Sequence, residues 1–215
     1  TMGTSIAMEI NAAKLLFHLM DAVNCTDNIV PVSGYRSPSE QAKIYNDSLI
    51  ENGAEFTKKY VALPWHSEHQ TGLAVDLALN QEHIDFIRPY FPYKGICQNF
   101  RIMAPLYGFI ERYPKDKEAV TGIAHEPWHF RYVGFPHSKI ITEQGLTLEE
   151  YIDKLRYFPY DGKHLYFKHN NKIIEIFYLS LSETGTIRLT VNDYIFHQVS
   201  GNNVDGVIIT IWRDA

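Results

Sequence analysis

Two short segments of this chain carry imidazole and carboxylate side chains at spacings that suit a metal site. In residues 67–76, His69 stands seven positions before Asp76; in residues 126–129, Glu126 stands three positions before His129. Two His and one Asp or Glu are common protein ligands of a catalytic zinc, whose fourth position is left to water. A further carboxylate beside such a site can take a proton from that water. The two segments therefore predict a metallohydrolase.

The order of these groups along the chain suggests their separate roles. A glycine and an apolar strand follow His69, and that strand presents Asp76. A proline follows Glu126, which predicts a turn and not the helix of the His-Glu-x-x-His metallopeptidases. We predict that His69, Asp76 and His129 are the metal ligands and that Glu126 is the base. Residue chemistry leaves two exchanges open, namely Glu126 as a ligand instead of Asp76 and His66 as a ligand instead of His69.

The choice of metal also has a rival interpretation. Two nitrogens and one carboxylate suit zinc, but they suit iron, cobalt and nickel as well. The same trio forms the facial triad of non-haem iron oxygenases, which also need a cosubstrate site and a larger β scaffold. The additional carboxylate of Glu126 favours hydrolysis over oxygenation.

The composition limits the class of protein. The chain has 215 residues, of which 45% are hydrophobic and 21% are charged, so it suits one medium domain with or without a small appendage. Its 20 basic and 25 acidic side chains give a formal net charge of -5, which predicts no nucleic-acid partner and no polybasic membrane patch. No apolar run reaches the length of a membrane span, about 18 residues. We expect a cytoplasmic protein, although residues 1–4 are also compatible with a removed signal or anchor.

Local patterns predict the elements that hold the candidate residues. Apolar residues at three- and four-residue steps predict an amphipathic helix over residues 6–23. Ser37, followed by Pro38 and Glu40, predicts a capped helix that ends near Gly53. Further helices are predicted over residues 101–108 and 148–155, and strands over residues 29–33, 73–79, 109–113 and 128–133.

The pattern of residue types changes after residue 156. Short β-rich runs alternate with turn residues, which predicts strands over residues 164–168, 173–179, 186–191, 194–199 and 207–212. We therefore predict an α+β protein that has one domain over residues 1–156 and a small β-rich appendage over residues 157–215.

The motifs and their order resemble a known family. Residues 67–76 read Ser-x-His-x-x-Gly-x-Ala-x-Asp, and residues 126–129 read Glu-x-x-His. This pattern resembles the zinc D-alanyl-D-alanine peptidases of the VanY and VanXY type, which act in vancomycin resistance. The resemblance covers residues from about 30 to about 155 and does not include the C-terminal appendage. The further segments that carry it are residues 33–37, 41, 62–64, 108–110, 112–114 and 126–132.

The resemblance implies a fold, a metal and a set of roles. The implied fold is a small α+β domain with a central antiparallel sheet flanked by helices, in which Zn²⁺ is held by His69, Asp76 and His129. Glu126 would act as general base and then as general acid, and Arg36 would polarise the scissile carbonyl group. The implied substrates are D-Ala-D-Ala and the pentapeptide precursor of peptidoglycan. The residues implied for the substrate cleft are Ser33, Gln41, Ser67 and Trp128.

Other functions remain open on these residues. One is an LD-carboxypeptidase or endopeptidase on the same zinc scaffold, and another is a non-catalytic module that binds peptidoglycan stems. The complete set of ligands, base and arginine argues against a decayed copy. Residues 80–95 lie where a loop at the cleft edge would tune the choice between dipeptide and pentapeptide. The appendage is expected to dimerise the protein, cover the cleft or dock to cell-wall material, and the sequence does not indicate an oligomeric state.

Overall fold

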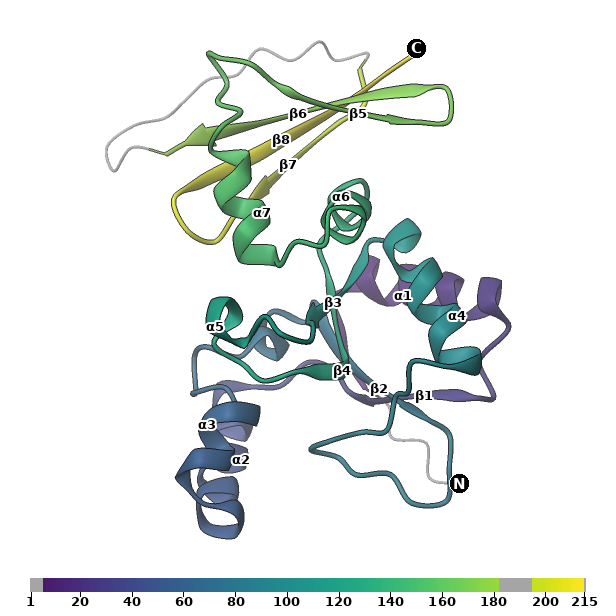
Figure 1. Cartoon of the computed structure of the whole chain (residues 1–215), viewed down its shortest axis with the longest axis vertical. Helices are drawn as coiled ribbons and strands as arrows, with labels where there is room; N and C mark the ends of the chain where they lie inside the picture. The colour runs from purple at the N-terminus through teal and green to yellow at the C-terminus, as the bar shows by residue number, and fades with distance from the viewer. Residues whose placement is uncertain (1–5, 182–194, 215) are drawn as a thin grey trace. The chain divides into compact units, whose positions relative to one another are not determined.

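The computed structural model describes residues 6–181 and 195–214 and divides the chain into two compact units, Thr1–Thr147 and Leu148–Ala215 (Figure 1). The sequence places the boundary at residue 156, whereas helix α7 (Leu148–Leu155) groups with the second unit. The chain that leaves α7 pairs at once with a strand of that unit, since the N–H of Tyr178 donates to the carbonyl of Phe158 at 2.8 Å. The separate roles of the two units remain a prediction.

The first unit is built around an antiparallel sheet. Its strands, as far as the structure describes them, are β1 (Ile29–Ser33), β2 (Ala74–Leu79), β4 (Glu126–Tyr132) and β3 (Phe109–Tyr113), in that spatial order. The α+β class and the central antiparallel sheet are therefore confirmed. Strand β4 begins two residues earlier than predicted, so Glu126 lies in the strand and not in a turn before it.

An apolar layer packs one face of this sheet. It is formed by α1 (Ile10–Val23), α4 (Gly95–Met103) and the 3-10 turn η2 (Ala104–Tyr107), as Figure 1 shows. Phe91, Phe100 and Phe130 meet edge to face in this core, with ring centroids 5.1–5.8 Å apart. The predicted first helix starts four residues late, at Ile10, because the Glu9 side chain caps it. No helix among the described residues is long and apolar enough to cross a membrane.

Two helices lie beside the sheet, next to the candidate functional residues. Helix α2 (Pro38–Asn52) begins at the predicted Ser37 cap, where Ser37 and Glu40 form a capping box. It is followed by α3 (Ala54–Tyr60), and the hydroxyls of Ser48 and Thr57 are hydrogen bonded at 2.8 Å between the two helices. The sequence predicted neither α3 nor three further short elements of this unit: η1 (Glu68–Thr71), α5 (Glu118–Thr121) and α6 (His137–Glu143).

The second unit joins α7 to its own antiparallel sheet. The strands that the structure describes there are β5 (Leu165–His169), β6 (Lys172–Ser180), β8 (Gly206–Asp214) and β7 (His197–Gly201), in that spatial order. Asn170 adopts a positive φ of 51° in the turn between β5 and β6, which is a conformation that Asn tolerates. The predicted strand over residues 186–191 lies outside the described residues.

A buried carboxylate on β6 links this strand to β8 and to the segment just before β5. Glu175 on β6 is 7% exposed and accepts hydrogen bonds from His164 Nδ1 at 2.7 Å and from Arg213 Nε at 2.8 Å. Burial alone would raise the pKa of Glu175, but the hydrogen bonds from His164 and Arg213 outweigh burial and lower it. A lowered carboxyl pKa stabilises the fold above the unfolded value of about 4.3, and that contribution is lost as the pH falls through the folded pKa.

We expect Glu175→Gln to destabilise this unit by about 1–3 kcal/mol at pH 7, the cost of losing hydrogen bonds to a charged group. The measurement is thermal unfolding of the full chain between pH 7 and pH 3, followed by fluorescence. Below about pH 4.5 the native chain should lose stability more steeply than the variant. Asp161→Asn, at an exposed carboxylate of the same unit, is the control. Parallel pH profiles for native chain and Glu175→Gln would contradict this role.

Candidate metal centre and cleft

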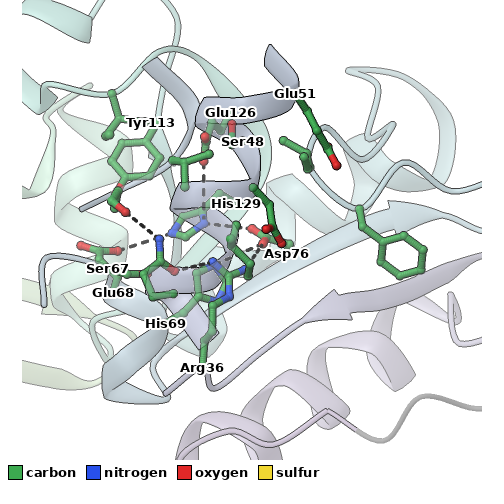
Figure 2. A pocket seen from close by; sticks show the side chains of 18 residues that line it. Arg36, Ser48, Glu51, Ser67, Glu68, His69, Asp76, Tyr113, Glu126 and His129 are labelled. Atoms are coloured by element: carbon green, nitrogen blue, oxygen red, sulfur yellow. Dashed lines mark hydrogen bonds and ion pairs between the residues drawn. The ribbon is translucent and has the colours of Figure 1, made fainter. Parts of the chain in front are cut away.

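The three side chains predicted as metal ligands lie together in the first unit. His69 Nε2 is 3.1 Å from one carboxylate oxygen of Asp76, and His129 Nδ1 is 2.9 Å from the other. One ligand atom from each residue lies within 4.8 Å of the other two, and all three residues are buried (Figure 2). His66 is exposed and is not part of this group. The geometry therefore brings together two imidazoles and one carboxylate around a single point.

The sheet and one short turn explain this convergence. Asp76 on β2 is paired directly with His129 on β4, so the two side chains emerge next to each other on one face. His69 lies in η1, which Gly72 ends with a positive φ of 70°. A Cβ atom at Gly72 would also meet the backbone nitrogen of Glu9 at 3.0 Å, so glycine is needed here for both reasons.

The chemistry of the donors fits a zinc ion. His69 Nδ1 lies 2.7 Å from the carbonyl oxygen of Gly34, which fixes the proton on Nδ1 and leaves Nε2 toward Asp76. Burial alone would raise the pKa of Asp76, but the neighbouring His69 and His129 hold it well below its usual range. Burial opposes charge on His129, but Asp76 and Glu68 raise its pKa to about 10. An anionic carboxylate between two imidazoles, each with an outer partner, is the donor set of a catalytic zinc site.

Glu126 stands beside this group. Its Oε2 atom is 3.8 Å from His129 Nδ1, and its side chain is buried. The pairing of β3 with β4 shifts register between Glu111 and Tyr113, where Glu126 pairs with Tyr113. This irregularity places Glu126 and His129 on one side, although their separation by three residues would put them on opposite faces of a regular strand. Burial raises the pKa of Glu126 to about 8, and the nearby Asp76 acts in the same direction.

Arg36 is held at the edge of the same group. Its Nη1 donates to Gln41 Oε1 at 2.7 Å and its Nη2 donates to Ser33 Oγ at 2.8 Å. Gln41 in turn donates to the carbonyl of Ala62 at 2.6 Å, and Arg36 Nη2 lies 4.0 Å from Asp76. These contacts fix the plane of the guanidinium group and engage two of its five N–H donors.

A cleft opens over these residues. Gln41 and Ser67, both predicted for the cleft, line it, whereas Ser33 acts behind Arg36 through the hydrogen bond described above. Trp128 does not line this cleft; its side chain is 7% exposed and packs in the apolar core. The reason is strand alternation, since the neighbouring His129 faces the metal centre. The other walls come from α2, from Tyr113 and from residues 86–87.

Two residues of the site escaped the sequence analysis. The Tyr113 ring lies 5.0 Å from the His129 ring, and the Glu68 carboxylate lies 3.5 Å from His129 Nε2. Glu68 also pairs with Arg112 and Arg131, and all three side chains are largely buried. The two arginines within predicted strands were the available signal, because arginines are rarely buried without a partner.

Comparison with known proteins identifies the relatives of the chain. The VanY family, described as D-alanyl-D-alanine carboxypeptidase, matches residues 5–135. The chain belongs to the VanY family. A relative in Enterococcus gallinarum, the bifunctional D-Ala-D-Ala dipeptidase and D-Ala-D-Ala carboxypeptidase VanXYC, is 48% identical over 70% of this chain and 80% of its own length. A D-alanyl-D-alanine carboxypeptidase of Enterococcus faecium is 40% identical over 84% of this chain, which spans 52% of that longer protein.

Solved structures are similar to this chain as well. The D,D-dipeptidase VanXYg, in complex with a D-Ala-D-Ala phosphinate analogue, is 52% identical and matches 96% of this chain and 82% of its own with a TM-score of 0.93. A VanY D,D-pentapeptidase variant in complex with Zn(II) matches 67% of this chain and 83% of its own, at 33% identity and a TM-score of 0.55. The LD-carboxypeptidase LdcB matches 68% of this chain and 69% of its own, at 38% identity and a TM-score of 0.59.

Proposed function

We propose that this chain is a zinc-dependent D,D-peptidase that cleaves the bond between two D-alanines. Its substrates are D-Ala-D-Ala and peptidoglycan precursors that end in D-Ala-D-Ala, and their removal contributes to glycopeptide resistance. The observation that carries the proposal is the convergence of the His69, Asp76 and His129 donors with Glu126 and Arg36 at one cleft. The names and ligands of the relatives VanXYC and VanXYg support the same substrates.

The three donors would hold the zinc ion through His69 Nε2, His129 Nδ1 and a carboxylate oxygen of Asp76. A zinc ion with three protein ligands lowers the pKa of water at its open position toward about 7. Asp76 supplies the negative charge that balances part of the charge of the cation. The outer contact from His69 to Gly34 keeps that ring in the required tautomer.

Glu126 performs the proton transfers in this proposal. Its carboxylate accepts a proton from the attacking water as the water oxygen bonds to the carbonyl carbon of the scissile peptide. When the C–N bond breaks, Glu126 returns that proton to the leaving amine of D-alanine. Its position 3.8 Å from the metal-facing nitrogen of His129 suits both transfers.

Arg36 stabilises the charge that develops on the carbonyl oxygen. Its plane is already fixed by Gln41 and Ser33, so no reorganisation is needed as the charge forms. Gln41 and Ser67 lie on the cleft surface, where we propose that they contact the substrate. Action on cytoplasmic precursors, which the composition led us to expect, remains a prediction.

We expect Arg36→Ala to lower kcat by about 10²- to 10³-fold, because loss of one donor to an oxyanion costs about 2.7–4 kcal/mol. KM should change less than kcat, since the contact matters most in the transition state. Arg36→Lys keeps the charge but cannot reproduce the two fixed hydrogen bonds, so it should recover a part of the loss. Steady-state kinetics on D-Ala-D-Ala tests this. A rise in KM with unchanged kcat would assign Arg36 to ground-state binding instead.

An LD-carboxypeptidase is the second candidate, and the 38% identity to LdcB favours it. The deciding experiment measures D-alanine release from D-Ala-D-Ala, from a pentapeptide ending in D-Ala-D-Ala and from a tetrapeptide ending in a single D-Ala, each with and without a zinc chelator. Chelator-sensitive release from the first two supports the dual D,D-peptidase. Release from the tetrapeptide alone supports the LD-carboxypeptidase, and release from none leaves the binding module.

A further inference from the structure

Glu68 lies in η1 and lines the same cleft as Ser67, and its carboxylate faces His129, the proposed ligand on β4. Its Oε2 atom lies 3.5 Å from Nε2 of His129, and both side chains are labelled in Figure 2. Its Oε1 atom accepts from Arg112 Nε at 2.8 Å and pairs with Arg131 Nη1 at 3.0 Å. The two oxygens therefore serve different neighbours, one the arginines and one the imidazole.

In the part of the chain that the structure describes, Glu68 and His129 each have one buried polar atom without an assigned hydrogen bond, and these atoms are a complementary acceptor and donor. Among the described residues, Glu68 Oε2 and His129 Nε2 are buried atoms to which no hydrogen bond is assigned. Since His129 Nδ1 faces Asp76 at 2.9 Å, a His129 that binds a metal through Nδ1 must carry its proton on Nε2. Among the contacts that the structure describes, the acceptor nearest to that nitrogen is Glu68 Oε2, at 3.5 Å. The arrangement parallels His69, whose outer nitrogen lies against the carbonyl of Gly34.

The arginines explain why the carboxylate stays in place. Arg112 lies on β3 and Arg131 on β4, so Glu68 forms ion pairs with two adjacent strands of the sheet. Two guanidinium groups at 2.8 and 3.0 Å from Oε1, both largely buried, favour the charged form of the Glu68 carboxyl group. The carboxylate is thus an anionic acceptor with little freedom to rotate.

We propose that Glu68 is a positioning residue that sets the tautomer and the ring orientation of His129 for metal binding. The inference rests on the proposed zinc site. The alternative is that Glu68 and its two arginines only stabilise the packing of η1 against β3 and β4. A structural role predicts loss of stability without a specific effect on the metal, whereas positioning predicts a specific loss of zinc affinity.

Glu68→Gln separates the two roles. Both arginines donate at the position of Oε1, so the amide oxygen will turn to them and the amide NH₂ will face His129 Nε2. An NH₂ group at that position favours the tautomer with its proton on Nδ1, the nitrogen that the metal needs. The substitution therefore keeps the size of the side chain and replaces the acceptor that faces His129 Nε2 with a donor.

The experiment compares zinc dissociation constants, measured by chelator competition, for the native chain and for Glu68→Gln, with the melting temperature of each metal-free protein recorded alongside. We expect zinc binding 10- to 100-fold weaker, about the range found for lost outer partners of metal ligands. The Co²⁺-substituted variant should also show an altered visible spectrum. Glu68→Asp, which retains the acceptor with a shorter reach, should recover part of the affinity and serves if Glu68→Gln does not fold.

Glu111→Gln is the matched control, because Glu111 is a carboxylate of the same unit that is as buried as Glu68 and pairs with Arg101 at 2.6 Å, but its ion pairs are with Arg101 and His125 and not with a proposed ligand. We expect this control to lose stability but to bind zinc within threefold of the native chain. Equal zinc affinity in Glu68→Gln and the native chain, or an equal loss in Glu111→Gln, would overturn the positioning role. Failure of the native chain itself to bind zinc would instead overturn the proposed function.

Discussion

Glu126→Gln should retain zinc but lose about 10³- to 10⁴-fold in kcat on D-Ala-D-Ala, because one side chain serves as base and then as acid. The amide has the size of the carboxyl group and cannot accept or return the proton. The fold should tolerate it, since burial already raises the pKa of Glu126 to about 8 and thus favours a neutral group. Zinc content and steady-state kinetics, measured on the same preparation, are the required data.

Glu118→Gln is a suitable control for this experiment, because Glu118 lies exposed on α5 in the same unit. It should leave kcat and zinc content unchanged. A Glu126→Gln variant with near-native kcat would remove Glu126 from the reaction and reopen the assignment of the base. Loss of zinc together with activity would indicate that Glu126 is a metal ligand. This is the alternative that residue chemistry alone left open, with Glu126 as a ligand instead of Asp76.

His69→Ala and His129→Gln should each lose both zinc and turnover, because two protein ligands are too few for a catalytic zinc site. We expect turnover to fall to background and zinc dissociation constants to rise by more than about 10²-fold, beyond the effect of losing an outer partner. Chelator competition and D-alanine release measure the two effects. The glutamine at position 129 keeps a polar group near Asp76, which limits the cost of leaving that carboxylate buried.

His66→Ala provides the control for the ligand assignment. His66 lies three residues before His69 but is exposed and outside the group of converging donors. Its removal should leave zinc affinity and kcat at native levels. If His66→Ala lost zinc and His69→Ala did not, the two histidines would have to exchange roles.

These results bear on the rival functions as well. A binding module that retained the fold would tolerate Glu126→Gln and Arg36→Ala without loss of peptide binding. An LD-carboxypeptidase would show the same sensitivity to both substitutions but on a substrate with a single terminal D-Ala. Kinetics on the panel of peptides, repeated with the variants, therefore shows whether the chain catalyses the D,D-peptidase reaction, the LD-carboxypeptidase reaction or neither.

Local features of the structure followed from the sequence alone. The Ser37 cap, Pro38 and Glu40 act within one turn of chain, and helix α2 begins where they predicted. Helix α7 likewise spans the predicted residues 148–155, with acidic residues in its first turn. The types of the candidate ligands were also readable, since two His and one carboxylate are the usual protein ligands of a catalytic zinc, and the structure brings these three side chains together.

The tertiary structure decided what depends on strand register. The pairing of Asp76 with His129 joins residues 53 positions apart, and the shift beside Tyr113 brings Glu126 to their side. Spacing along the chain does not specify register, and a slip of one residue exchanges the faces of a strand. For the same reason Trp128 packs in the core instead of the cleft, and Glu68 reaches His129 instead of solvent. Residue types thus determined the chemistry available to this protein, whereas sheet pairing determined which groups meet.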